Sequence, residues 1–215
     1  SLNYPLLFMD FEAVMPAVPL YERTSPYQHI PFQYSVHSVE RPGAGARHRE
    51  FLSDGKGDPR REFAMRLIED TRGVGDIIVY GEPFERSVLL ALAAFFPEWA
   101  NDLRNRAGRL RDLMLPFRNH HYYTRAMKGH CSLKRVLPAL VPGAEYGRLA
   151  VCDGFAAQRA FLELVECGDC ARAAGLREGL REYCALDTLG MALIVERMRG
   201  IAQKGETSHA GGRPA

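Results

Sequence analysis

The sequence has no long hydrophobic run. Its longest uninterrupted apolar stretch, Val88 to Phe96, has nine residues, whereas a helix needs about 20 apolar residues to cross a bilayer. Residues 1–8 also lack the basic region and the small-residue cleavage pattern of a secretory signal. We therefore expect neither a membrane span nor a secretion signal.

Cysteine is scarce as well. The five cysteines are an odd number at uneven spacings, which is not the pattern of a disulfide scaffold. Cys167 and Cys170 form a single CxxC motif without a second pair at the spacing that is typical of a zinc site. This composition predicts a cytoplasmic protein.

The chain has almost no excess charge of either sign, since its net charge is +2. The basic residues are nevertheless unevenly placed: residues 104–135 hold nine of them and one acid, Asp112, for which we expect a structural role. Cations interleaved with aromatic rings can contact phosphates and stack on the bases of a single strand, although a solvated basic face is the alternative. The segment offers Arg109, Arg111, Phe117 and the six residues that we select as nucleic-acid-binding: Arg118, Tyr122, Tyr123, Lys128, Lys134 and Arg135.

Length and periodicity predict one α/β domain over residues 1–203, followed by a disordered tail over residues 204–215. The first strands are expected to form an antiparallel meander, and later strands to extend it as a mixed sheet flanked by helices. The predicted strands are residues 4–14, 32–39, 49–53 and 76–80. The predicted helices are residues 84–96, 132–140, 155–165 and 176–201, and one that opens at residues 58–59 and closes before Gly73. Residues 109–115 fit a strand and a helix equally.

Two acids interrupt the most hydrophobic predicted strand, LLFMDFEAV. Asp10 and Glu12 are two residues apart, so their side chains leave the same face of that strand. A buried carboxylate is costly unless something positive compensates for it. The pair therefore indicates either a cation site or a strand end that emerges into water.

Two further places in the chain carry candidate acids. Tyr183 and Asp187 lie four residues apart in the last predicted helix, so the phenol and the carboxylate share one face. Glu85 lies in the first turn of the helix that follows residues 76–80. The simpler interpretations are a solvated Asp187 and a Glu85 that interacts favourably with the helix dipole.

Taken in order, an Asp-x-Glu strand, an acid at a helix start and a Tyr-x3-Asp helix resemble the DEDD superfamily of 3′–5′ exonucleases. The Tyr places the resemblance in the DEDDy branch, whose fold is ribonuclease H-like. The amino-acid sequence around these residues resembles even more closely a bacterial family of uncharacterised domains, domain of unknown function 2779. The similarity covers residues 4–200, and the stretches that carry it are FMDFEAVMPAVP, RTSPYQHIPFQYS, KGHCSLKRVLPAL and EYCALDT.

The resemblance implies a role for each of these side chains. Asp10, Glu12 and Asp187 would hold two Mg²⁺ or Mn²⁺ ions, with Asp10 between them, and Glu85 would supply the acid of the second motif. Two such ions can stabilise both the attacking and the leaving oxygens of a phosphoryl displacement. Tyr183 would orient the attacking water. The implied activity is metal-dependent phosphodiester hydrolysis of DNA or RNA that is single-stranded or has a free 3′ end.

The sequence departs from the exonuclease pattern at two positions. The acid of the second motif is usually Asp and here is Glu85, and Gly81 replaces an Asn that often lies near it. These departures favour an alternative, a module that binds nucleic acid or a partner protein without cleaving it. An endonuclease is a third interpretation. Because the sequence does not begin with Met, we also expect that other domains of a longer chain accompany this one.

Overall fold

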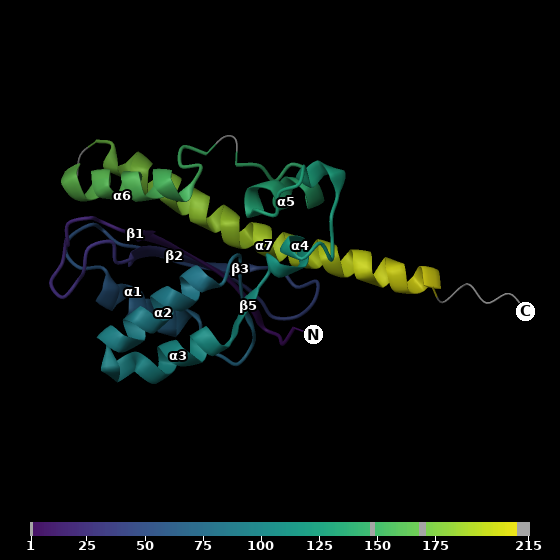
Figure 1. Cartoon of the computed structure of the whole chain (residues 1–215), viewed down its shortest axis with the longest axis horizontal. Helices are drawn as coiled ribbons and strands as arrows, with labels where there is room; N and C mark the ends of the chain where they lie inside the picture. The colour runs from purple at the N-terminus through teal and green to yellow at the C-terminus, as the bar shows by residue number, and fades with distance from the viewer. Residues whose placement is uncertain (1, 147–148, 168–170, 210–215) are drawn as a thin grey trace, which may run out of the picture.

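Five strands form one mixed sheet at the centre of the protein (Figure 1). The computed structural model describes residues 2–146, 149–167 and 171–209. The strand order across the sheet is β3-β2-β1-β4-β5. The strands are β1 (Leu6–Val14), β2 (Ile30–Val39), β3 (Arg47–Leu52), β4 (Ile77–Val79) and β5 (Leu110–Asp112).

The sheet topology confirms the expected fold class. β1, β2 and β3 pair as an antiparallel meander, and β4 and β5 add to β1 as parallel strands. This is the ribonuclease H-like arrangement. β1 lies in the middle, and every residue in it except the half-buried Asp10 is buried, as expected for a strand that is covered on both faces.

Helices cover the two faces of the sheet in separate groups (Figure 1). On one side lie α1 (Arg60–Asp70), α2 (Pro83–Phe95) and α3 (Ala100–Gly108), and on the other lie α5 (Leu133–Leu140), α6 (Gly154–Cys167) and α7 (Ala173–His209). The short helices are η1 (Pro97–Trp99), α4 (Leu115–Arg118) and η2 (Arg125–Met127). Among the described residues, no helix is long and apolar enough to cross a membrane.

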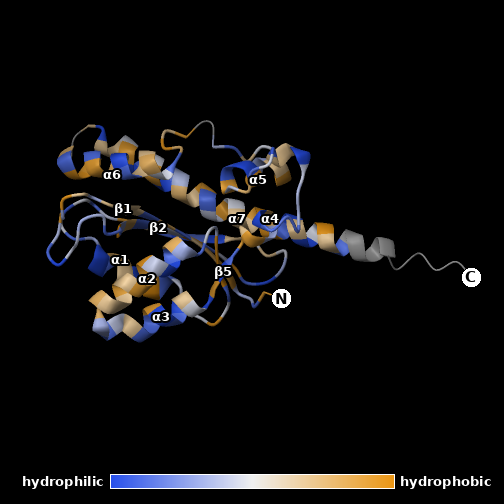
Figure 2. Ribbon diagram, viewed as in Figure 1, coloured by the Kyte–Doolittle hydropathy of each residue, from blue (hydrophilic) through white to orange (hydrophobic). Residues whose placement is uncertain are grey.

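The core is divided by the sheet because successive side chains of β1 point to opposite faces. Met9 and Phe11 pack with Phe63 and Leu89 on the α1–α2 side, while Phe8 packs on the α7 side. In Figure 2, β1 and α2 are largely orange, and the coloured part of α7 alternates between orange and blue. The two faces of β1 therefore belong to different layers, and the even-numbered residues share the α7 side.

The structure differs from the predicted elements in three places. α3 was not predicted, because only Leu103 and three small or cationic residues of its ANDLRNRAG sequence are buried. The ambiguous residues 109–115 form β5 and then the start of α4. α7 continues to His209 instead of ending at Ile201, so residues 204–209 are helical although the sequence placed them in a disordered tail. Residues 210–215 of that tail lie outside the described residues.

Part of the basic segment contributes to the sheet edge, and one of its aromatic residues lies in the core. The Arg109 side chain donates to the carbonyl oxygen of Gly75 at 2.6 Å, and Arg111 forms an ion pair with Asp76 at 3.1 Å. Phe117 is 1% exposed and belongs to the core. These three side chains are committed to structural contacts, and Phe117 has no free face for a base.

The described cysteines are in two states. Cys131, Cys152 and Cys184 are free thiols, whereas Cys167 at the end of α6 is disulfide-bonded. Cys170, the second cysteine of the CxxC motif, lies outside the described residues.

Gly75 supplies a test of the packing at the start of β1. A Cβ atom at this position would lie 1.8 Å from the carbonyl oxygen of Pro5, and the neighbouring Asp76 amide is hydrogen-bonded to Asn3 at 2.8 Å. Because backbone on both sides would have to move, we expect Gly75→Ala to lower the free energy of unfolding by about 1–3 kcal/mol or more. Urea denaturation measures this change.

Gly45→Ala is the matched control, since no atom lies within 4 Å of the Cβ that it would add. A surface change of this kind is expected to stay within about 0.5 kcal/mol of the wild type. Equal effects of the two substitutions would contradict the assigned contact at Gly75.

Candidate metal centre

Three acids from the two ends of the chain meet on the α7 side of the sheet. Asp10 and Glu12 come from β1, and Asp187 comes from α7. Each of the three offers a carboxylate oxygen, and these oxygens lie within 4.8 Å of one another. The structure therefore brings together three of the four acids that the sequence singled out.

Strand geometry and helix packing place these carboxylates. The period of two in β1 directs Asp10 and Glu12 to the face that α7 covers, and the Cys184 thiol of α7 lies 3.5 Å from Asp10 Oδ2. Asp187 follows one turn later on the same helix. Glu12 and Asp187 are 7% and 6% exposed, so little water reaches their carboxylates.

Burial raises the pKa values of all three acids, and repulsion within the group adds to the shifts of Asp10 and Glu12. Burial raises the pKa of Asp10 well above its usual range, and repulsion by Asp187 and Glu12 adds to this shift. The pKa of Glu12 rises to about 8, through burial first and then repulsion by Asp187. Burial raises the pKa of Asp187 to about 6. A cation between these groups would relieve the repulsion.

Glu85 lies beside this group but not within it. The residue is in the first turn of α2 and is 3% exposed, and its Oε2 has no hydrogen-bond partner among the described residues. Burial raises the pKa of Glu85 to about 8, and the charges of Asp112 and Glu12 contribute. The charge of Glu85 also contributes to the raised pKa of Asp10. The longer side chain therefore ends near the three acids without joining their 4.8 Å group.

The backbone before α2 explains why glycine occupies position 81. Gly81 has a φ of +98°, which disfavours other residues, and an added Cβ would lie 3.1 Å from Met114 Cε. Its amide donates to Asp112 Oδ1 at 3.0 Å, and the Met114 amide donates to the same oxygen at 2.8 Å. Asp112 thus has the structural role that the sequence predicted for it.

Two tyrosines and a lysine surround Asp187. The Tyr146 hydroxyl donates to Asp187 Oδ1, and Tyr183 is 5% exposed one turn before Asp187. Lys134 Nζ lies 5.2 Å from the ring centroid of Tyr183 and 5.8 Å from that of Tyr146. It donates to the carbonyl oxygen of Cys152 at 2.6 Å, and its charge lowers the pKa values of both Glu12 and Asp187.

Sequence reasoning missed Tyr146. This residue lies in the loop after α5 and belongs to no motif, and no spacing relates it to Asp187. Lys134 was selected from the basic segment as a nucleic-acid contact, and the structure adds that it is the basic side chain next to the acids.

The other five selected residues make no described contact with the acids. Tyr123 is 49% exposed, and Tyr122 is half-buried and packs edge-on against Phe117 with ring centroids 6.2 Å apart. The three remaining cations are exposed: Arg118, Lys128 and Arg135. They are available to a ligand, whereas Lys134 is the one of the six selected residues whose charge affects the acids of the candidate centre.

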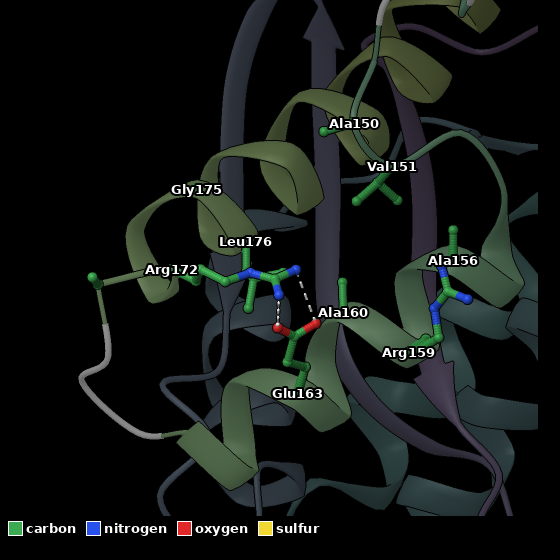
Figure 3. A pocket seen from close by; sticks show the side chains of 10 residues that line it. Ala150, Val151, Ala156, Arg159, Ala160, Glu163, Arg172, Gly175 and Leu176 are labelled. Atoms are coloured by element: carbon green, nitrogen blue, oxygen red, sulfur yellow. Dashed lines mark hydrogen bonds and ion pairs between the residues drawn. The ribbon is translucent and has the colours of Figure 1, made fainter.

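A separate pocket of about 520 Å³ lies between α6 and the start of α7 (Figure 3). Small apolar side chains such as Ala156 and Ala160 line it, and Glu163 forms an ion pair with Arg172 at 3.0 Å. None of the acids or tyrosines of the metal centre lines this pocket. The charge of Glu163 is already compensated, so this pocket is not the candidate centre.

Comparison with known proteins places the chain in a family. The family model for a domain of unknown function, DUF2779, matches residues 7–132. The chain belongs to this family. The matched segment of this DUF2779 domain contains Asp10, Glu12 and Glu85, and it ends just before Lys134. No curated protein matches the chain, and no solved structure does.

The raised pKa values predict how stability depends on pH without metal. A carboxyl group with a higher pKa in the folded protein stabilises the fold while it is protonated. For Glu12, this contribution is complete below the ordinary value of 4.5 and is lost as the pH rises to about 8. We therefore expect the free energy of unfolding in EDTA to fall between pH 5 and pH 8, by at least about 1.4 kcal/mol, which is the value of one pKa unit.

The measured quantity is the difference between the wild type and Glu12→Gln in chemical denaturation at each pH. A difference is needed because burial lowers the pKa of His37 to about 4. The contribution of this histidine to the stability of the fold therefore increases as the pH rises toward 6.5, which opposes the fall caused by Glu12. The fall should be smaller in Glu12→Gln and unchanged in the exposed control Glu40→Gln. An identical fall in all three proteins would show that Glu12 is not part of a repelling cluster.

Proposed function

We propose that this domain is a metal-dependent 3′–5′ exonuclease of the DEDDy type that hydrolyses phosphodiesters in DNA or RNA. The observation that carries the proposal is the meeting of Asp10, Glu12 and Asp187 within 4.8 Å, with Tyr183 one turn before Asp187. The ribonuclease H-like sheet supports it, because the acids lie on the central strand and on the helix that crosses it.

The residues present fit two Mg²⁺ or Mn²⁺ ions. All four candidate ligands, Asp10, Glu12, Glu85 and Asp187, offer carboxylate oxygens, which are the donors that these hard cations prefer. The Oε2 of Glu85 is buried without a partner among the described residues, and a bound cation would satisfy it. When bound, such ions stabilise the charge that develops on the attacking and leaving oxygens of a phosphoryl group.

The side chains around the acids have separate tasks in this proposal. Tyr183 orients the attacking water through its hydroxyl, since burial keeps that hydroxyl protonated by raising its pKa. The Tyr146 hydroxyl holds one oxygen of Asp187, and the carboxylate presents an oxygen to Asp10 and Glu12, where a cation would bind. Lys134 binds a non-bridging oxygen of the phosphate, because its ammonium group is the positive charge that lowers the pKa values of Glu12 and Asp187.

The substrate proposed here is a single strand or a free 3′ end. Lys134 would hold the phosphate at the centre, while Arg118, Lys128 and Arg135 would contact the backbone beyond it and Tyr122 and Tyr123 would stack on bases. We propose the cytoplasm as its location, since the odd number and uneven spacing of the cysteines are not those of a disulfide scaffold.

A second candidate function is binding of nucleic acid without cleavage. The position of Glu85 outside the 4.8 Å group favours it, since a site with three ligands could lack the second cation. Binding that depends on salt, persists in EDTA and yields no shortened product would support this second function. A circular single strand distinguishes an exonuclease from an endonuclease, which is the third interpretation. An enzyme that needs a free end leaves the circle intact.

Asp10→Asn tests the proposed centre. The substitution removes one of the repelling charges, so we expect Mn²⁺ binding by calorimetry to be lost and the melting temperature to stay unchanged or rise. Release of mononucleotides from a labelled single strand should fall to background. Glu40→Gln, an exposed change of equal charge, should affect neither measurement. A wild-type protein that binds no Mn²⁺ and leaves DNA and RNA intact would rule out the nuclease.

Lys134→Met tests the phosphate contact. The methionine keeps the apolar stem over the tyrosine rings and removes the charge. We expect weaker binding of a single-stranded oligonucleotide and a slope of log K against log salt that is smaller by about one. Fluorescence anisotropy at several salt concentrations measures both effects. Arg41→Met, which removes an exposed charge in the β2–β3 turn, should leave both values unchanged, and equal losses would contradict a specific role for Lys134.

A further inference from the structure

Polar side chains of β2 contact α7 next to the metal centre. In the β1–β2 pairing, Gln33 lies opposite Glu12 and Ser35 lies opposite Asp10, and directly opposed residues share a face of the sheet. His37 follows two residues later on this face. All three side chains are buried, so β2 presents a polar row to α7 beside the two acids of β1.

Thr188 of α7 is the centre of this contact. Its side chain is 0% exposed, and its Oγ1 lies 2.7 Å from Ser35 Oγ and 2.8 Å from His37 Nδ1. Ser35 Oγ also lies 2.9 Å from His48 Nε2 on β3. Thr188 directly follows Asp187 in the chain, and Ser35 lies opposite Asp10 in the sheet. The hydrogen-bond network therefore connects the helix position next to Asp187 with the strand position next to Asp10.

A second contact lies further along the same helix. Gln33 Nε2 donates to the carbonyl oxygen of Leu180 at 2.8 Å. From Leu180 to Thr188 the helix rises about 12 Å, and from Gln33 to His37 the strand extends about 13 Å. The two contacts therefore attach α7 to β2 at both ends of the helical segment that carries Tyr183 and Asp187.

Apolar side chains fill the adjoining part of the interface. Leu6, Phe8 and Ile78 of the sheet pack against Met191 and Val195 of α7. Apolar packing is roughly proportional to buried area and has little directional preference, whereas a hydrogen bond weakens steeply when its angle is distorted. The hydrogen bonds, and not the apolar contacts, can therefore define the rotation of α7 to within a fraction of a turn.

We propose that Thr188 is a positioning residue, whose hydroxyl, through Ser35 and His37, sets how closely the Asp187 carboxylate approaches Asp10 and Glu12. The inference rests on the proposed function in so far as the positioned acids bind metal. A valine would fill the same space and make no hydrogen bond, and it would leave the buried Ser35 and His37 without their shared partner. Outer groups of this kind typically change metal affinity by about 10–100-fold when they are removed.

The experiment compares Thr188→Val with Thr188→Ser in the full chain. Thr188→Val keeps the shape and loses the hydroxyl, and Thr188→Ser keeps the hydroxyl and loses a methyl group. We expect Mn²⁺ affinity by calorimetry to fall at least about tenfold in Thr188→Val and to remain near the wild-type value in Thr188→Ser. Crystal structures of both variants should show the Asp187 carboxylate displaced from the other two acids in the valine variant alone.

Ile194→Val is the control for simple loss of stability, since Ile194 is a buried apolar residue of the same helix. It should lower the melting temperature without changing Mn²⁺ affinity. Wild-type affinity in Thr188→Val, or an equal loss in Thr188→Ser, would overturn the positioning role. If the wild type bound no Mn²⁺, the proposed function would fail, and the position of Asp187 in the two crystal structures would still decide the role of Thr188.

Discussion

Repulsion among three buried carboxylates is the constraint on which the rest of the structure depends. Asp10, Glu12 and Asp187 share a space in which Asp187 and Glu12 raise the cost of ionising Asp10, and Asp187 raises the cost of ionising Glu12. Such a cluster lowers stability, so the surrounding fold must hold it together against its own charge. Extensive apolar packing on both faces of β1 provides that stability.

The groups around the three acids differ in charge between the two sides of the cluster. On the α7 side, Lys134 and the Tyr146 hydroxyl favour the charged forms of the acids, whereas on the α2 side Glu85 adds a further negative charge. The resulting field attracts cations toward the space between β1, α2 and α7. The matched part of the DUF2779 family contains the first three acids, and the last helix completes the group.

Much of this arrangement could be predicted from the sequence, because periodic patterns report on local structure. The run of apolar residues in β1 predicted a buried strand, and the two-residue spacing of Asp10 and Glu12 placed both on one face. The Tyr183–Asp187 spacing predicted a shared helix face. Contacts that depend on loops could not be predicted in this way. Tyr146 reaches Asp187 from a loop without a motif, and Arg109 bonds to a carbonyl oxygen 34 residues earlier in the chain. In both cases the basis is tertiary proximity, on which a linear pattern carries no information.

The separation of the acids along the chain has a consequence for synthesis of the protein. Cys184, beside Asp187, is 174 residues from Asp10, which it contacts. While the ribosome is still making the middle of the chain, β1 can pair with β2 and β3 before Asp187 of α7 adds its negative charge next to Asp10 and Glu12. The acidic group is therefore assembled last, and a chain that stops before the final helix contains Asp10 and Glu12 without Asp187.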